Sequence, residues 1–178
     1  VKQVFDEVSA SLLIDGNVFT KTSEADSRVH VLMIPLKTIG SGTVAMDNGT
    51  TVTLKINYKG STKVFANVFY GVLADYDPTG KSLDELAREA LNHLHTVGNA
   101  SPPVAVLFVE NSDGDSELDR FEKGFLLVLL GEKYSVLPNT VITVEIRPSK
   151  GIPITTEITV STFSTFHFVS VLTCSFQI

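Results

Sequence analysis

An acidic stretch from Glu110 to Asp119 is the densest group of residues that could bind a metal ion. Asp113, Asp115 and Glu117 place carboxylates at alternate positions, and Ca²⁺ takes about six to eight oxygen ligands. In the helix–loop–helix calcium motif the loop glycine follows the third ligand, whereas Gly114 precedes Asp115 here. A solvated acidic turn is therefore the main interpretation, with a weak calcium site at Asp113, Asp115 and Glu117 as the alternative. We expect no other metal and no cofactor.

The four histidines do not form a recognisable metal-binding or nucleophile motif. His93 and His95 lie two residues apart near the end of a predicted helix, so their side chains diverge by roughly 200° and cannot share a metal ion. An imidazole near a helix C-terminus is favoured by the helix dipole. His30 and His167 lie in predicted strands with hydrophobic flanks, where a hydrogen-bonded or solvent-facing histidine is the more frequent outcome.

Motifs for nucleotide binding and hydrolysis are incomplete or missing. Gly40-Ser41-Gly42 fails as a dinucleotide fingerprint, because Ala45 stands at the next glycine position and no clear helix follows. Gly80-Lys81-Ser82 matches the end of a phosphate-binding loop, but no glycine stands at the upstream position that the motif requires. Neither a Gly-x-Ser-x-Gly elbow nor a His-Glu-x-x-His motif is present. Cys174, the single cysteine, is predicted to be a buried, inert thiol. We therefore expect no enzyme activity.

Two triplets match the acceptor pattern for N-glycosylation, Asn48-Gly49-Thr50 and Asn99-Ala100-Ser101. Pro102 follows the second triplet directly and makes it the poorer acceptor. Both would function only in a eukaryotic secretory pathway, which nothing in the sequence indicates.

The composition limits the class of protein. The chain has 178 residues, of which 43% are hydrophobic and 19% charged, with a net charge of -6, and this excludes a disordered chain. Apolar runs such as 125–130 reach six residues, far below the roughly 20 that a membrane helix needs. Residues 1–7 contain neither a signal-peptide core nor a basic arm for nucleic acid, since Lys2 is the only base before Lys21.

Alternation of apolar and polar residues is the main structural signal, and it is typical of antiparallel strands. Between Thr51 and Tyr58, for example, Val52, Leu54 and Ile56 fall on one face and Thr and Lys residues on the other. Turn-forming Gly, Pro, Asn and Asp separate the strands. The predicted strands lie near residues 11–14, 28–36, 51–58, 63–73, 104–109, 124–130, 140–147, 154–163 and 166–178.

One helix interrupts the strands, and we predict it over residues 83–97. Ser82 and Glu85 form a capping box, in which each side chain satisfies a free amide of the first turn. Leucines and alanines then recur at helical spacing, Gly98 can end the helix, and Pro102-Pro103 prevent its continuation. Such a helix is expected to cover an open end or face of a sandwich. The fold class is therefore mainly β: one antiparallel β-sandwich domain over residues 1–178, of jelly-roll or Greek-key type, with one inserted helix.

The last 28 residues contain a single charged residue, Glu157. Such an uncharged, strand-forming segment would aggregate at an exposed sheet edge, so it must be covered. These strands therefore lie centrally in the two sheets, or they are buried against other copies of the chain. The candidate interface residues are Phe163, Phe166, Phe168, Val169 and Val171.

Two classes of function remain. The preferred one is a self-associating structural protein, most simply a single jelly-roll coat or another virion subunit, in a virion or extracellular assembly. Its partners would be copies of itself or other structural subunits, and no basic nucleic-acid-binding arm is evident. The alternative is a ligand-binding or adhesion sandwich that recognises a carbohydrate or receptor, including a fibre or pilus subunit.

Overall fold

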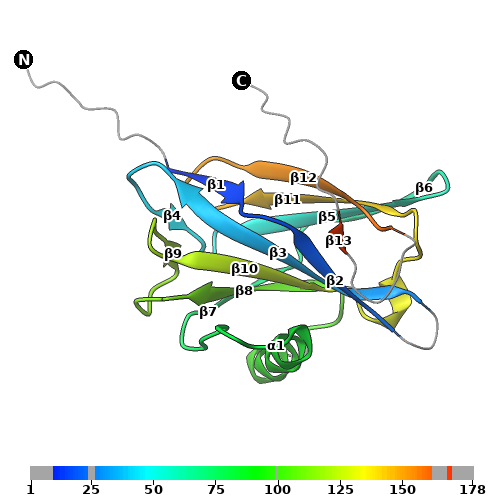
Figure 1. The fold of residues 1–178 in the computed structure, drawn as a ribbon, viewed down its shortest axis with the longest axis horizontal. Coiled ribbons are helices and arrows are strands. Elements are labelled where there is room, and N and C mark those ends of the chain that lie inside the picture. Colours follow the sequence, from blue (N-terminus) through cyan, green and yellow to red (C-terminus); the bar gives the residue numbers. More distant parts are fainter. Residues whose placement is uncertain (1–9, 24–26, 99, 162–167, 170–178) are drawn as a thin grey trace, which may run out of the picture.

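Two stacked β-sheets and one outer helix make up the computed structural model, which describes residues 10–23, 27–98, 100–161 and 168–169 (Figure 1). The order of the seven-stranded sheet is β13 (Phe168–Val169), β2 (Val18–Thr22), β3 (Val29–Ile39), β10 (Lys123–Leu129), β8 (Val104–Glu110) and β7 (Phe69–Leu73), and β1 (Ser11–Ile14) also pairs with β3. The order of the four-stranded sheet is β12 (Ile154–Thr159), β11 (Val141–Arg147), β5 (Thr51–Tyr58) and β6 (Ser61–Phe65). A separate pair consists of β4 (Val44–Ala45) and β9 (Glu117–Leu118). The predicted fold class is confirmed: the chain is mainly β, with one helix between strands.

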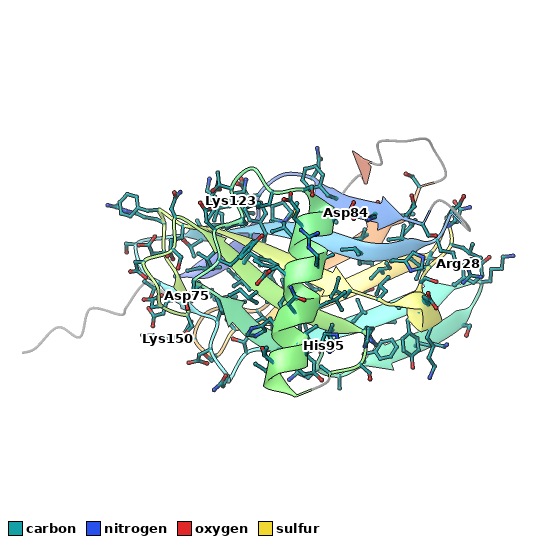
Figure 2. The ribbon with its side chains drawn as sticks, turned by 90° about the horizontal axis from the view of Figure 1, so that it is seen from below. Arg28, Asp75, Asp84, His95, Lys123 and Lys150 are labelled. Atoms are coloured by element: carbon teal, nitrogen blue, oxygen red, sulfur yellow. The ribbon has the colours of Figure 1, made fainter. Side chains whose placement is uncertain are left out.

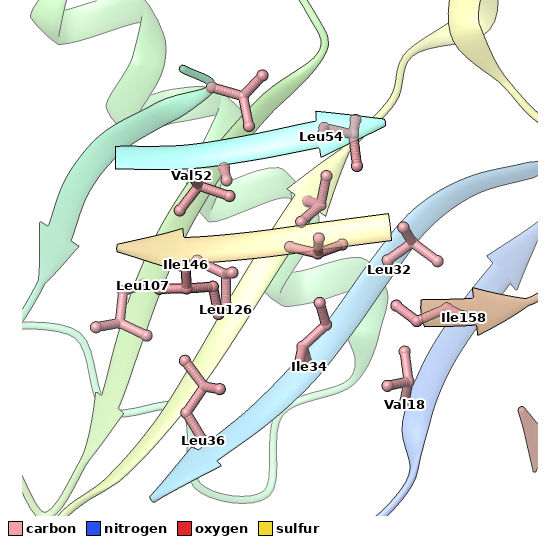
Figure 3. Packing of buried hydrophobic residues seen from close by; sticks show 14 of the residues in the cluster. Val18, Leu32, Ile34, Leu36, Val52, Leu54, Leu107, Leu126, Ile146 and Ile158 are labelled. Atoms are coloured by element: carbon pink, nitrogen blue, oxygen red, sulfur yellow. The ribbon is translucent and has the colours of Figure 1, made fainter. Parts of the chain in front are cut away.

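The main core lies between the two sheets. In β5, the predicted inward residues Val52, Leu54 and Ile56 are buried, and the register with β11 places each opposite a buried valine or isoleucine. Burial of each such side chain stabilises the fold by about 1.5–3 kcal/mol. Both sheets contribute to this core, which Figure 3 labels at Val18, Leu32, Ile34, Leu36, Leu107 and Leu126 of the first sheet and Val52, Leu54, Ile146 and Ile158 of the second.

The helix α1 (Leu83–Val97) has the predicted bounds and the predicted capping box. The Ser82 hydroxyl accepts the Glu85 amide hydrogen at 3.3 Å, and the Glu85 carboxylate accepts the Ser82 amide hydrogen at 2.9 Å. Bonds from the Ser82 amide and hydroxyl hold the pKa of Glu85 below its usual value. At the other end, Gly98 has φ +134° and donates its amide hydrogen to the carbonyl of Leu94. No helix in the described ranges is long and apolar enough to span a bilayer.

α1 lies against the outer face of the seven-stranded sheet (Figure 2). Its buried residues Leu86, Ala90 and Leu94 form a second hydrophobic cluster with outward-facing residues of β8 and β10, including Phe108 and Leu127. β8 is consequently buried on both faces, which explains the uninterrupted apolar run from Val104 to Val109. The expected covering of a sandwich face by the helix is thus observed.

β7 and β8 run parallel, a pairing that the alternation pattern did not predict. α1 connects them, so β7, α1 and β8 form a crossover unit in an otherwise antiparallel pair of large sheets. Parallel neighbours require a long connection of this kind, because the chain must return to the same end of the sheet.

The single strand predicted near 63–73 is two strands in different sheets. β6 ends at Phe65 and β7 begins at Phe69. Asn67 lies between them and stabilises the segment in which the chain passes from one sheet to the other. Its side-chain oxygen accepts the amide hydrogens of Val52 at 3.3 Å and Phe69 at 3.0 Å. The short strands β2, β4 and β9 were not predicted.

The uncharged C-terminal segment lies at sheet edges wherever the structure describes it. β12 is the outermost strand of the four-stranded sheet, and β13 is outermost in the order of the larger sheet, paired with β2. The hypothesis that these strands lie centrally is therefore wrong for β12, because β11 is its only strand neighbour in this sheet among the residues that the structure describes. β12 ends at Thr159, short of the predicted end at residue 163.

Candidate functional site

The carboxylates considered for calcium binding are used to hold their own loop. An Asp113 oxygen accepts the Asp115 amide hydrogen at 3.2 Å, an Asp115 oxygen accepts the Glu117 amide hydrogen at 2.7 Å, and Glu117 accepts the Thr43 hydroxyl hydrogen. Across the described residues, no group of three or more His, Cys, Asp or Glu side chains is arranged to bind a metal ion. The arrangement accounts for these acids as turn-forming residues and gives the calcium hypothesis no support.

We call residues 110–122 the acidic loop. It contains six acidic residues and one basic residue, a net charge of -5 against -6 for the whole chain. Glu122 stabilises the backbone of the acidic loop from within. Its side chain is only 7% exposed and accepts the amide hydrogens of Asp113 at 3.1 Å and Asp119 at 3.0 Å. Burial raises the pKa of Glu122 above its usual value, because it disfavours the charged carboxylate more than these bonds stabilise it.

Phe121 protrudes from the acidic loop. Its side chain is 70% exposed, the largest exposed fraction among the large hydrophobic residues that the structure describes. The Arg120 guanidinium carbon lies 4.4 Å from the centre of its ring, in a cation–π arrangement. An Asp119 oxygen accepts the Phe121 amide hydrogen at 2.6 Å and so fixes the backbone at this point. The loop therefore presents a positioned aromatic ring among acidic side chains.

A cleft of about 300 Å³ opens beside the end of the β5–β6 hairpin. Its floor is apolar and includes Ile56 and Val136, which are 8% and 5% exposed. Three cationic residues line it, and none of the acidic residues that the structure describes does. We call this site the basic cleft, lined by Arg28, Ile56, Tyr58, Ser61, Lys63, Lys133, Tyr134, Ser135, Val136, Leu137 and Thr140.

Tyr134 is the centre of the basic cleft. It belongs to the short 3₁₀-helix η1 (Glu132–Tyr134), and the ammonium nitrogens of Lys63 and Lys133 lie 5.4 and 5.2 Å from the centre of its ring. Arg28 adds a third cation and donates to the Ser135 carbonyl at 3.5 Å. An anionic group that entered the cleft would meet the ammonium groups of Lys63 and Lys133 beside an aromatic surface.

No sequence motif marks the basic cleft. Its cations come from three distant segments: the residue before β3, the strand β6, and η1. No local spacing links these segments, so the fold alone brings them together.

The basic cleft and the acidic loop lie at opposite ends of the molecule. The acidic loop joins the end of β8 to the start of β10, whereas η1 follows the other end of β10. The seven residues of β10 separate them by roughly 20 Å. The figures agree: β9, within the acidic loop, is at the left in Figure 1 and β6 at the right, and Figure 2 places Arg28 at the right, away from Lys123.

His93 and His95 have different surroundings, as their spacing predicts. His93 lines a groove of about 350 Å³ beside α1, together with Asp75 and Glu89, whereas His95 is exposed and does not line it. His30 is a half-buried residue of β3. His167 and Cys174 lie outside the described residues.

The predicted interface residues are only partly covered by the structure. Phe168 and Val169 form β13, which pairs with Phe19 and Val18 of β2. Phe163, Phe166 and Val171 lie outside the described residues. Of the two glycosylation triplets, Asn48 lies on an exposed turn, and Asn99 is outside the described residues.

No protein-family model and no curated protein sequence matches the chain. Among solved structures, the fold is similar to archaeal flagellin FlaB1 from Methanocaldococcus jannaschii, with a TM-score of 0.66 and 15% sequence identity over 92% of this chain and 96% of that one. It is also similar to the archaeal flagellum of Methanospirillum hungatei strain JF1, with a TM-score of 0.51 and 12% identity over 89% of this chain and 70% of that one. Identities this low establish a shared fold only.

Proposed function

We propose that this chain is a structural subunit that assembles with copies of itself into a filament, and that it has no catalytic role. The observation that carries the proposal is the similarity of its fold to a flagellin over nearly the whole length of both chains. The second solved structure is also described as a flagellum. This similarity favours a filament over the virion coat expected from the sequence.

The sheet edges support self-association. β12 exposes Thr155, Glu157 and Thr159, which provide only one charge along an outermost strand. An outermost strand presents unpaired backbone groups that can pair with another chain, and natural proteins usually protect such edges with charges. This edge is suited to a contact between subunits. The C-terminal residues Phe163, Phe166, Phe168, Val169 and Val171 are proposed to belong to the same contact region.

A ligand-binding or adhesion module is the second candidate, and the basic cleft is the observation that favours it. Tyr58 and Tyr134 offer surfaces on which a sugar ring can stack, and the neighbouring lysines suit an acidic group. Binding of acidic glycans by a chain that never self-associates would favour this candidate.

Sedimentation velocity over a wide range of concentration, combined with electron microscopy, tests the filament proposal. We expect oligomers that grow with concentration and visible filaments. A chain that stays monomeric at every concentration would contradict the proposal.

A matched pair of variants locates the contact. Thr155→Lys/Thr159→Lys adds two charges to the exposed side of β12, and Leu91→Lys/Val97→Lys adds the same charge at exposed positions of α1. The β12 variant is expected to weaken association by about tenfold or more, because charges along a strand edge oppose pairing. Equal association of both variants and the unmodified chain would exclude the β12 edge as the contact.

A further inference from the structure

We infer that the basic cleft receives the acidic loop of a second copy of this chain, so that subunits join end to end. The inference deepens the proposed function and rests on it, because it names the contact that would extend the filament along one direction.

Charge complementarity is the first argument. The acidic loop has a net charge of -5, and the basic cleft is lined by Arg28, Lys63 and Lys133 and by none of the acidic residues within the described ranges. Lys63 and Lys133 are exposed, and the salt bridges observed among the described residues involve neither. Complementary patches of this kind steer association and fix the register of the contact.

Phe121 is the second argument. An exposed aromatic ring surrounded by acids has the composition of an interface anchor, since aromatic residues dominate binding energy when they enter a pocket. The basic cleft offers an apolar floor and two tyrosine rings, and a phenylalanine side chain buries about 150–250 Å² in such surroundings. The hydrogen bond from the Phe121 amide to Asp119 orders the backbone before contact, which lowers the entropic cost of binding.

The positions of the two surfaces are the third argument. A contact between two different patches on identical chains is heterologous, and it produces either a closed ring or an open filament. Because the acidic loop and the basic cleft lie at opposite ends of β10, each added subunit leaves one free patch of each kind. Repeated contacts of this kind add subunits end to end and so lengthen a filament.

Charge exchange between the two surfaces tests the inference on the full chain by sedimentation velocity. Lys63→Glu/Lys133→Glu makes the cleft acidic, and Asp113→Lys/Asp115→Lys adds positive charge to the loop. Each variant alone is expected to lose association by tenfold or more, because the introduced glutamates would face the acids of the loop, or the introduced lysines would face the lysines of the cleft. An equimolar mixture is expected to regain it, because one contact then joins the two unmodified surfaces and the other places the introduced lysines against the introduced glutamates. Association of the unmodified chain should also weaken as NaCl rises from about 0.05 M to about 0.5 M.

Two controls separate charge and anchoring from damage to the loop. Asp113→Asn/Asp115→Asn retains the side-chain oxygens that accept the loop amides and removes two charges, so it should still weaken association. Phe121→Ser should weaken it as well, whereas Val97→Ser, which replaces an exposed apolar side chain on α1, should not. Circular dichroism should show an unchanged fold for all of these variants.

The outcomes distinguish this inference from the filament proposal. If the unmodified chain associates but the cleft and loop variants associate equally well, or if the mixture fails to restore association, the inference is wrong and the filament proposal stands. A chain that is always monomeric overturns both. If Lys63→Glu/Lys133→Glu abolishes binding to a heparin oligosaccharide while self-association is unchanged, the cleft is a ligand site and the inference is wrong.

Discussion

The ring of Tyr134 packs edge-on against the ring of Phe65, with centroids 4.8 Å apart and planes inclined at 72°. Tyr134 belongs to η1, which follows β10 of the seven-stranded sheet, and Phe65 ends β6 of the four-stranded sheet. The contact therefore connects the two sheets at the basic cleft and holds its walls in position. It also places the Tyr134 ring beside Lys63.

Removal of the Tyr134 ring should destabilise the protein and open the cleft. We expect Tyr134→Ala to lower the free energy of unfolding by about 1–3 kcal/mol, because a half-buried aromatic contact is lost. Tyr134→Phe retains the ring and should stay within about 0.5 kcal/mol of the unmodified chain. Urea denaturation measures both. Equal stability of the Ala and Phe variants would show that the Phe65 contact contributes nothing.

Gly131, immediately before η1, should tolerate no side chain. Its backbone has φ +67° and ψ 175°, a region open essentially to glycine alone, and an added Cβ would lie 2.7 Å from the Cβ of Pro102. We expect Gly131→Ala to lower the free energy of unfolding by about 2–4 kcal/mol. Gly60→Ala, at φ +80° with no atom within 4 Å, isolates backbone strain and should cost less. A smaller effect at Gly131 than at Gly60 would contradict this account.

The sequence was most informative where local patterns and packing agree. The helix from Leu83 to Val97 has both a capping box and an apolar stripe, and the structure confirms both. The strand from Thr51 to Tyr58 has strict alternation and one buried face, so its bounds were predicted correctly.

Other features depend on contacts between distant segments and left no local signal. The chain passes from one sheet to the other at Asn67, within a run that reads as one continuous strand. The parallel pairing of β7 with β8 follows from where α1 returns the chain. The basic cleft likewise combines Arg28, Lys63 and Lys133, which only the assembled sheets bring together.

The capping box should contribute measurably to stability. Ser82→Ala removes the hydroxyl that accepts the Glu85 amide hydrogen, and we expect a loss of about 1 kcal/mol in the free energy of unfolding. Ser82→Asp retains an acceptor at the same place and should remain close to the unmodified chain. Thermal and urea denaturation provide the measurement. Ala and Asp variants of equal stability would show that α1 is held by its packing alone.

Glu122 should make stability depend on pH. Burial raises its pKa in the folded state above the usual 4.5, so between these two pKa values the folded chain binds more protons than the unfolded one. Stability contributed by such a group falls as pH rises through that window. The window begins near pH 4.5 and ends above the raised pKa of the folded state.

Comparison with Glu122→Gln isolates this effect, because Gln does not titrate but retains one oxygen for the amide of Asp113 or Asp119. The variant has a constant offset of about 1–3 kcal/mol in the free energy of unfolding, because one of these two backbone amides loses its carboxylate acceptor. The quantity to follow is the free energy of unfolding of the unmodified chain minus that of the variant. This difference should decline as pH rises from about 4 and then become constant. Urea denaturation at a series of pH values measures this difference. A difference that moves the other way would mean that the amide bonds outweigh burial, so that the pKa of Glu122 is lowered instead.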